Sequence, residues 1–185
     1  MKLLTIYGSS RKNGNSEALT KKVLQQLNPK DVDEIHLMDV HIEPIVDERH
    51  TEHGFRPVDD DYEKLAIQIM NHQVLLFSTP LYWYGMSGRM KNLIDRFTQS
   101  LRSTEYDFKE KMKGKKMYVI IVGGQSAPYT ALPLVQQFQL IAQFMEIEFS
   151  GYVIGRGVKP LEVLEDEEAI VQAIQLGKRI RGELK

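Results

Sequence analysis

The chain has 185 residues, of which 42% are hydrophobic and 26% are charged, and its formal net charge is −1. These values are typical of one folded domain with a substantial core, and they exclude a disordered chain and a general binder of nucleic acids. The absence of cysteine excludes disulfides, thiol catalysis and thiolate metal sites, and it is consistent with a reducing compartment. No apolar run approaches the roughly 18 residues of a membrane span, so we expect a cytoplasmic protein without membrane insertion.

Strand and helix patterns alternate along the chain. Short apolar runs predict five strands, at residues 3–7, 32–37, 74–77, 116–122 and 147–154. Amphipathic patterns predict a helix that carries Leu19 to Leu27, one that carries Tyr62 to Met70, and helices at 86–98, 131–145 and 164–180. The run at 32–37 alternates apolar and polar residues, as an edge strand does, whereas 74–77 and 116–122 are continuously apolar, as in strands buried on both faces. Residues 99–115 read as a charged, solvated connector.

This alternation predicts an α/β fold with a doubly wound, five-stranded parallel sheet. Of the two common strand orders, the flavodoxin-like order 2-1-3-4-5 requires only five strands, and we expect it here. In that order the loops after the first, third and fourth strands meet at the carboxyl edge of the sheet, where open α/β sheets bind ligands. These are the three most unusual loops of the chain, at 8–16, 78–88 and 123–130. The sequence therefore predicts one binding site at that edge.

The loop at 8–16, Gly-Ser-Ser-Arg-Lys-Asn-Gly-Asn-Ser, suits an anion because it leads from a strand into a helix N-terminus. It has neither the Gly-Lys-Ser/Thr ending of a Walker loop nor the Gly-x-Gly-x-x-Gly dinucleotide pattern, so a terminal monophosphate is its simplest ligand. An ordinary helix-capping turn is the alternative. The candidate phosphate-binding residues are Ser9, Ser10, Arg11, Gly14, Asn15 and Ser16.

The other two loops suit the flat part of a ligand. Residues 82–84 are Tyr-Trp-Tyr and follow a buried strand, where aromatic surface can contact a planar ring, although such rings also pack in cores and interfaces. The third loop begins with Gly123 and Gly124, which allow backbone N–H groups to approach a ligand closely. A phosphate at one end and a planar heteroaromatic ring at the other describe flavin mononucleotide (FMN).

Two motifs carry a family resemblance. Gly-Ser-x-Arg-x-x-Gly-Asn-Ser at 8–16 resembles the phosphate loop of the NAD(P)H-dependent FMN reductases. Pro-Leu-Tyr-Trp-Tyr at 80–84, followed by Ser-Gly-x-Met-Lys-Asn-x-Ile-Asp-Arg at 87–96, is similar to their isoalloxazine loop and following helix. The resemblance covers most of the chain. It implies a single flavodoxin-like FMN-binding domain over residues 1–185, NAD(P)H as electron donor, and a homodimer or homotetramer.

The resemblance also implies a set of cofactor contacts. It assigns the phosphate to Ser9, Arg11, Asn15 and Ser16. It assigns the ring to Pro80, Leu81, Tyr82, Trp83, Tyr84, Gly123 and Gly124, with Tyr129 as a looser candidate beside it.

The implied activity is an FMN-dependent NAD(P)H oxidoreductase that passes reducing equivalents to quinones, free flavin, nitro- or azo-aromatics or metal chelates by a ping-pong mechanism. Because the flavin carries the redox chemistry, no side chain is assigned as a general acid, and packing is the favoured role of Tyr82 and Tyr84. The alternative is a flavodoxin-type electron-transfer or regulatory flavoprotein that acts through protein partners. Arg11 and the near-neutral charge count against it, because flavodoxins usually lack this arginine and are strongly acidic.

Residues 40–58 form a long segment after the second strand, and we consider a lid, a subunit contact or a plain solvated loop. The spacing of His50 and His53 matches no helical zinc motif, so we expect no metal there. The chain also resembles the iron–sulfur flavoproteins, which carry a cysteine cluster in this segment. Since the chain has no cysteine, a thiolate-bound cluster is excluded.

Overall fold

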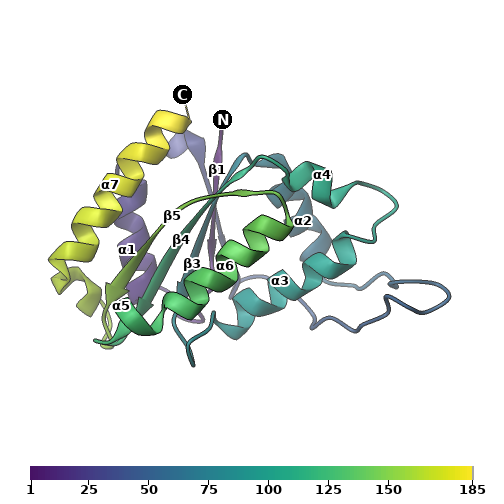
Figure 1. Cartoon of the computed structure of the whole chain (residues 1–185), viewed down its shortest axis with the longest axis horizontal. Coiled ribbons are helices and arrows are strands. Elements are labelled where there is room, and N and C mark those ends of the chain that lie inside the picture. The colour runs from purple at the N-terminus through teal and green to yellow at the C-terminus, as the bar shows by residue number, and fades with distance from the viewer. Residues whose placement is uncertain (185) are drawn as a thin grey trace.

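A five-stranded parallel sheet forms the centre of the computed structural model, which describes residues 1–184 (Figure 1). The strands are β1 (Leu3–Tyr7), β2 (Val32–His36), β3 (Val74–Pro80), β4 (Lys116–Gly123) and β5 (Glu148–Arg156). Their order is β2-β1-β3-β4-β5, and each neighbouring pair is parallel. The predicted flavodoxin-like fold and strand order are therefore confirmed.

Helices cover both faces of the sheet. α1 (Asn15–Leu24) and α7 (Glu167–Glu183) lie on one face, and α2 (Tyr62–Asn71), α3 (Gly88–Ser100), α4 (Phe108–Met112) and α6 (Leu132–Phe144) lie on the other (Figure 1). The short helix α5 (Ala127–Thr130) and the 3-10 turns η1 (Pro29–Asp31) and η2 (Glu162–Glu165) complete the described elements. None of the helices within residues 1–184 has the length and apolarity needed to cross a membrane.

The central strands are apolar throughout because each of them faces two apolar layers. In β3, Leu75 and Phe77 join the layer beneath α2, α3 and α6, while Val74 and Leu76 join the layer beneath α1 and α7. All four side chains are buried. The continuous apolar run in the sequence thus reflects burial on both faces, and it places the following loop at the middle of the carboxyl edge.

The prediction of a solvated connector at 99–115 is wrong. The stretch contains α4, whose Phe108 and Met112 are buried, and the Asp107 side chain caps the helix by accepting from the Glu110 N–H at 3.0 Å. Lys115 is also buried, and its Nζ donates to the Met70 carbonyl at 2.8 Å. Burial lowers the pKa of Lys115 to about 8, and nearby Lys111 acts in the same direction. Phe108 and Met112 form a single i,i+4 apolar pair among charged residues, and one such pair is too short a pattern to predict a helix.

Two further boundaries differ from the sequence prediction. The third loop is partly helical, because α5 lies within it, and the helix expected at 131–145 is α6. The helix expected at 164–180 is divided into η2 and α7 at Asp166, whose carboxylate accepts from the Ala169 N–H at 3.3 Å and from the Arg156 guanidinium at 2.7 Å. A single apolar periodicity runs through both parts, which concealed the division.

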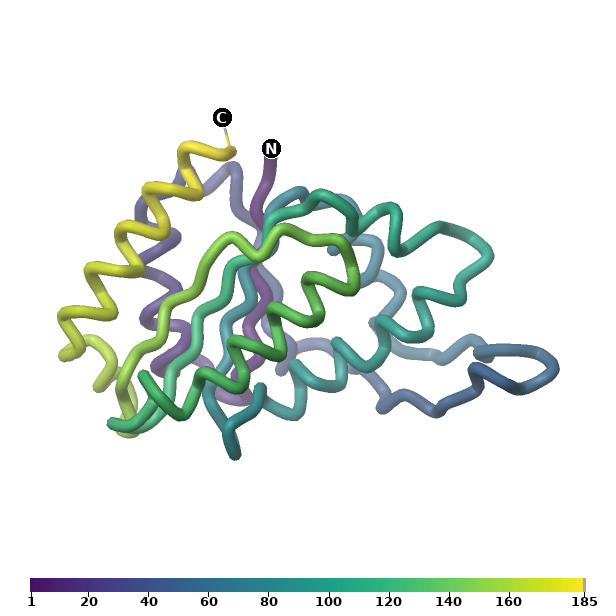
Figure 2. Tube along the Cα trace, in the orientation of Figure 1, coloured from purple at the N-terminus to yellow at the C-terminus, as the bar shows by residue number. Residues whose placement is uncertain are grey.

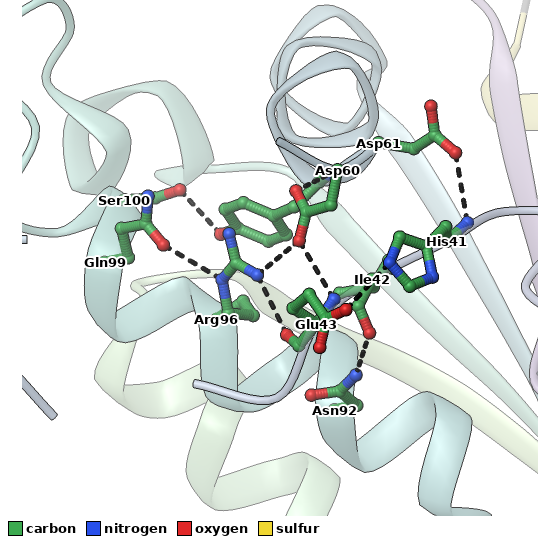
Figure 3. Close-up of polar contacts among 10 residues, drawn as sticks. His41, Ile42, Glu43, Asp60, Asp61, Asn92, Arg96, Gln99 and Ser100 are labelled. Atoms are coloured by element: carbon green, nitrogen blue, oxygen red, sulfur yellow. Dashed lines mark hydrogen bonds and ion pairs between the residues drawn. The ribbon is translucent and has the colours of Figure 1, made fainter. Parts of the chain in front are cut away.

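Residues 43–60, called the arm below, extend away from the body of the protein between β2 and α2 (Figure 2). Both ends of the arm are fixed to α3 by Arg96 (Figure 3). Its Nη1 donates to the Glu43 carbonyl at 2.9 Å and pairs with the Asp60 carboxylate at 2.6 Å. Its Nε donates to Gln99 at 2.9 Å, and its guanidinium lies 4.5 Å from the centre of the Tyr62 ring.

Further bonds hold the base of the arm. The His41 N–H donates to the Asp61 carboxylate at 3.0 Å, and Asn92 of α3 donates to the Ile42 carbonyl at 2.6 Å (Figure 3). No arm residue lines the cavity described below, within the part of the chain that the structure covers. The arm is therefore anchored at its base and does not act as a lid in this structure.

Candidate functional site

Loops at the carboxyl edge of the sheet surround a cavity of about 210 Å³. They follow β1, β3, β4 and β5. The N–H of Gly8 donates to the Ser78 carbonyl, and the N–H of Leu81 donates to the Val122 carbonyl, both at 2.8 Å. These bonds continue the sheet pairing beyond the strands, so the position of each loop is fixed by its neighbour. The cavity is lined by Ser9, Arg11, Gly14, Asn15, Ser16, Pro80, Leu81, Tyr82, Val122, Gly123, Gly124, Gly157 and Val158.

The first loop is held by contacts within itself. The Ser9 hydroxyl accepts from the Arg11 N–H at 3.0 Å and donates to the Arg11 carbonyl at 2.9 Å. Asn13 has a positive φ of 55°, and its N–H donates to the Glu17 carboxylate at 2.7 Å. The loop then enters α1, with Gly14 as its N-cap residue. The first N–H groups of α1 cannot be paired within the helix, so they supply donors to an anion beside Ser16.

Glu17 is the one carboxylate of the first turn of α1, and its charge is compensated locally. Burial alone raises its pKa, but hydrogen bonds from Lys21 and from the Asn13 N–H outweigh burial and hold the pKa below its usual value. Its distance to the Lys21 ammonium is 2.7 Å. Because Glu17 does not line the cavity, the only charged side chain of this loop that does is Arg11, among the described residues.

The second loop contains a tight hairpin. Tyr82 and Gly85 exchange backbone hydrogen bonds of 3.0 Å, which places Trp83 and Tyr84 at the tip with φ values of 49° and 65°. Positive φ at a residue other than glycine costs roughly 1 kcal/mol, so this turn is strained. The Trp83 side chain is 95% exposed. Of the three aromatic residues of this loop, only Tyr82 lines the cavity.

The third loop approaches the second closely at Gly123. A Cβ at this position would lie 3.1 Å from the Cβ atoms of Leu81 and Ala127. A side chain on residue 123 would therefore crowd both neighbours, and glycine allows the two loops to approach. Tyr129, on α5, is 79% exposed and does not line the cavity, and neither does the exposed Ser10. The structure thus brings most of the predicted residues together and leaves Ser10, Trp83, Tyr84 and Tyr129 outside.

The loop after β5 was missed by sequence reasoning. It contributes Gly157 and Val158 to the cavity, and Val122 at the end of β4 is a further lining residue that was not predicted. The signal was the strand order itself, because β5 lies next to β4 and ends at the same edge. The loops of unusual composition follow the three central strands, so local sequence does not single out the loop after β5.

The donors of this cavity fit the phosphate of FMN. Drug-sized ligands usually occupy pockets of roughly 300–1,000 Å³, so a cavity of about 210 Å³ has room for only part of FMN, such as the phosphate and the flexible chain. A groove of about 520 Å³ between α3 and α6 is larger, and its lining combines apolar side chains such as Leu140 and Phe144 with charged ones, but it includes no residue of the loops at 8–16, 78–88 and 123–130. The smaller cavity is therefore the better match to a phosphate-bearing ligand.

Within residues 1–184, no three His, Cys, Asp or Glu side chains converge to hold a metal ion. In the arm, acidic side chains near His50 pair with arginines instead. Asp47 contacts Arg49 at 2.7 Å, and Glu48 contacts Arg56 at 2.5 Å.

Comparison with known proteins agrees with the geometry. The sequence model of the family described as NADPH-dependent FMN reductase matches residues 1–157. YwqN of Bacillus subtilis, named as an NAD(P)H-dependent FMN-containing oxidoreductase, is 44% identical over 180 residues, which cover 97% of this chain and 98% of YwqN. The solved structure of Trp repressor binding protein from Bacillus subtilis is 36% identical, with a TM-score of 0.78, and the match covers 95% of this chain and 97% of that one. The iron–sulfur flavoprotein MJ1083 of Methanocaldococcus jannaschii is 23% identical, covering 100% of this chain and 98% of that protein. This chain belongs to the NADPH-dependent FMN reductase family.

Proposed function

We propose that this chain is an FMN-dependent oxidoreductase that takes reducing equivalents from NAD(P)H and passes them to a flat small-molecule acceptor. Quinones, free flavin, and nitro- or azo-aromatics are the acceptor classes, and the two half-reactions follow one another at the same site. The observation that carries the proposal is a cavity with a helix N-terminus and Arg11 at one end and an open aromatic loop at the other. When bound, FMN supplies the hydride and electron transfer.

At the phosphate end, the residues act as donors. The guanidinium of Arg11, the hydroxyl of Ser16 and the first N–H groups of α1 hold the phosphate, and the helix dipole favours its charge. Ser9 shapes the loop, because its hydroxyl donates to the Arg11 carbonyl at 2.9 Å. At the ring end, Pro80 to Tyr82 provide one side of the site, and the backbone at Gly123 and Gly124 approaches the ring edge. Donors at that edge stabilise negative charge on a reduced ring.

Trp83 and Tyr84 have a separate role in this proposal. Because they project from a strained hairpin and do not line the cavity, they contact the nicotinamide or the acceptor rather than the phosphate end. Their planar rings exclude water from the exposed side of the site. Contact with a planar substrate requires a fixed orientation of the rings and no proton donor. We therefore do not assign Tyr82 or Tyr84 as a catalytic acid.

The function is tested with the FMN-loaded protein in the absence of oxygen. We expect NADH or NADPH to bleach the flavin absorbance, and a quinone added afterwards to restore it. Flavin that neither nucleotide bleaches would indicate a flavodoxin-type carrier. Failure of the purified protein to take up FMN would contradict the proposed site itself.

We expect Arg11→Ala to weaken FMN binding about 10- to 100-fold, because a charge-assisted hydrogen bond contributes roughly 1.5–3 kcal/mol. Binding of riboflavin, which has no phosphate, should be unchanged. Lys12→Ala is the matched control: it removes a neighbouring exposed cation, which pairs with Asp39 at 2.9 Å and does not line the cavity. Flavin fluorescence titration measures both. Equal FMN affinity in wild type and Arg11→Ala would show that the guanidinium faces solvent.

We further propose one domain over residues 1–185, a cytoplasmic location and a homodimer or homotetramer. Both apolar layers pack on one sheet, which supports a single domain. The side chains of Leu140 and Phe144, in the groove between α3 and α6, are 58% and 61% exposed, and a second copy of the chain would cover them. Sedimentation velocity measures this assembly directly.

A further inference from the structure

The loop at residues 157–163, called the β5 loop below, forms one side of the cavity. The N–H of Gly157 donates to the Gly123 carbonyl at 2.8 Å, which fixes the start of the loop beside the third loop. Val158 follows and lines the cavity with a side chain that is 70% exposed. Its Cγ2 lies 3.7 Å from the point where a Cβ on Gly124 would stand. An exposed apolar side chain at this place would be covered by a ligand that fills the cavity.

The side chain of Asn15 attaches this loop to the first turn of α1. Its Nδ2 donates to the Lys159 carbonyl at 2.9 Å, and its Oδ1 accepts from the Val163 N–H at 3.3 Å. The fit is close, because a Cβ on Gly157 would lie 3.0 Å from the Asn15 amide nitrogen. One N–H of the amide and its oxygen are therefore engaged with the β5 loop. These two bonds fix the orientation of the side chain and leave a single amide N–H for any ligand in the cavity.

Glu162 holds the same loop from its other end. One oxygen of its carboxylate accepts from the N–H groups of Val158 at 2.5 Å and Lys159 at 2.8 Å. These two bonds hold the pKa of Glu162 below its usual value, so it remains charged at neutral pH. Leu161 has a positive φ of 64°, which is unfavourable for a branched side chain unless the surrounding contacts impose it. The β5 loop is thus held in one conformation that presents Val158.

We propose that the β5 loop is a wall of the FMN site, with Val158 in contact with the flavin, and that Asn15 is a positioning residue that fixes this wall to the phosphate-binding turn. The inference rests on the proposed cofactor site and changes the role of one residue within it. Asn15 acts on flavin binding through Val158, whereas Arg11 acts on the phosphate. The side-chain amide of Asn15 therefore couples the phosphate-binding turn to the loop wall that contacts the flavin.

Flavin affinities separate the two roles. We expect Asn15→Ala to weaken the binding of FMN and of riboflavin by the same factor, roughly tenfold, because two hydrogen bonds to the loop are lost. Glu162→Ala should weaken both flavins in the same way, although Glu162 does not line the cavity. The matched control is Glu165→Ala, an exposed carboxylate in the same 3-10 turn, which should leave both affinities unchanged. Flavin fluorescence titration again provides the measurement.

Hydrogen exchange gives a second readout that does not depend on riboflavin. In the wild type we expect FMN to slow exchange of the amides at 157–163, and in cofactor-free Asn15→Ala we expect these amides to exchange faster. A loss of affinity in Asn15→Ala confined to FMN would overturn the inference and make Asn15 a phosphate ligand. Wild-type affinities in both Asn15→Ala and Glu162→Ala, or no protection of the loop by FMN, would overturn it as well. Failure of the wild type to bind FMN would instead contradict the proposed function.

Discussion

Gly177→Ala should lower the free energy of unfolding by about 2 kcal/mol, even though alanine is the better helix former. Gly177 lies where α7 packs on α1. A Cβ at this position would meet the carbonyl oxygen of Val23, which belongs to the α1 backbone, and would lie 2.8 Å from Cγ of Gln26. A backbone atom cannot rotate away as a side chain can, so the two helices must separate. Urea denaturation of the cofactor-free protein measures the change.

The same helix contains its own control. At Gly182, no atom of the described residues lies within 4 Å of the position that a Cβ would take, apart from its chain neighbours and the backbone of its own helix. Gly182→Ala should therefore leave stability unchanged or raise it by up to about 1 kcal/mol, the difference in helix propensity. The two substitutions are chemically identical and should have opposite effects. A loss of the same size at both positions would contradict close packing as the cause.

Arg96→Met should destabilise the protein by about 3–5 kcal/mol, which is typical of breaking a buried ion pair from one side. The side chains of Arg96 and Asp60 are 2% and 1% exposed, so removal of the guanidinium leaves a buried carboxylate without its cation. The Glu43 carbonyl and Gln99 also lose their donor. Methionine keeps an unbranched side chain in the same space, which limits the loss of volume, while the guanidinium contact with the Tyr62 ring is lost with the charge.

An exposed pair on the same helix is the control for this substitution. The side chains of Lys91 and Asp95 are 47% and 39% exposed, so Lys91→Met should cost less than about 1 kcal/mol.

The loss of stability caused by Arg96→Met should also depend on pH. Burial alone raises the pKa of Asp60, but hydrogen bonds from Arg96, and also from backbone N–H groups, hold it below its usual value. The stability from this pair is present above the unfolded pKa of about 3.9 and is lost as pH falls through the lower folded pKa, so the deficit should shrink in acid. A deficit that is constant from pH 7 to pH 3 would exclude the ion pair as its source.

The sequence was sufficient for the sheet and for the central part of the site. Strands buried on both faces, such as residues 74–77, have a continuous apolar pattern, and loops that follow adjacent parallel strands must meet at one edge. Ser9, Arg11, Tyr82 and Gly123 were therefore predicted to come together from local chemistry and strand order, and they line one cavity.

The contacts that sequence reasoning missed depend on residues far apart in the chain. Asn15 and Lys159 are 144 positions apart, and no local pattern distinguishes an amide that binds a loop from one that binds a phosphate. Arg96 lies 36 positions from Asp60, so no local pattern in the sequence indicates that the two side chains pair. Backbone conformation at Trp83 was also inaccessible, because a two-residue turn with positive φ is expected at Asn-Gly and not at two aromatic residues. In each case the tertiary structure overrides the local preference.

The clamp that Arg96 forms at the base of the arm has an evolutionary consequence. Because Glu43 and Asp60 are fixed to α3 where the arm leaves and returns, the residues between them can change without altering the register of the sheet. Each doubling of the length of such a loop costs only about 0.6 kcal/mol in closure entropy. The arm is therefore a position at which this fold tolerates insertion, deletion and exchange of whole segments. New chemistry can be acquired there while the flavin-binding edge remains as it is.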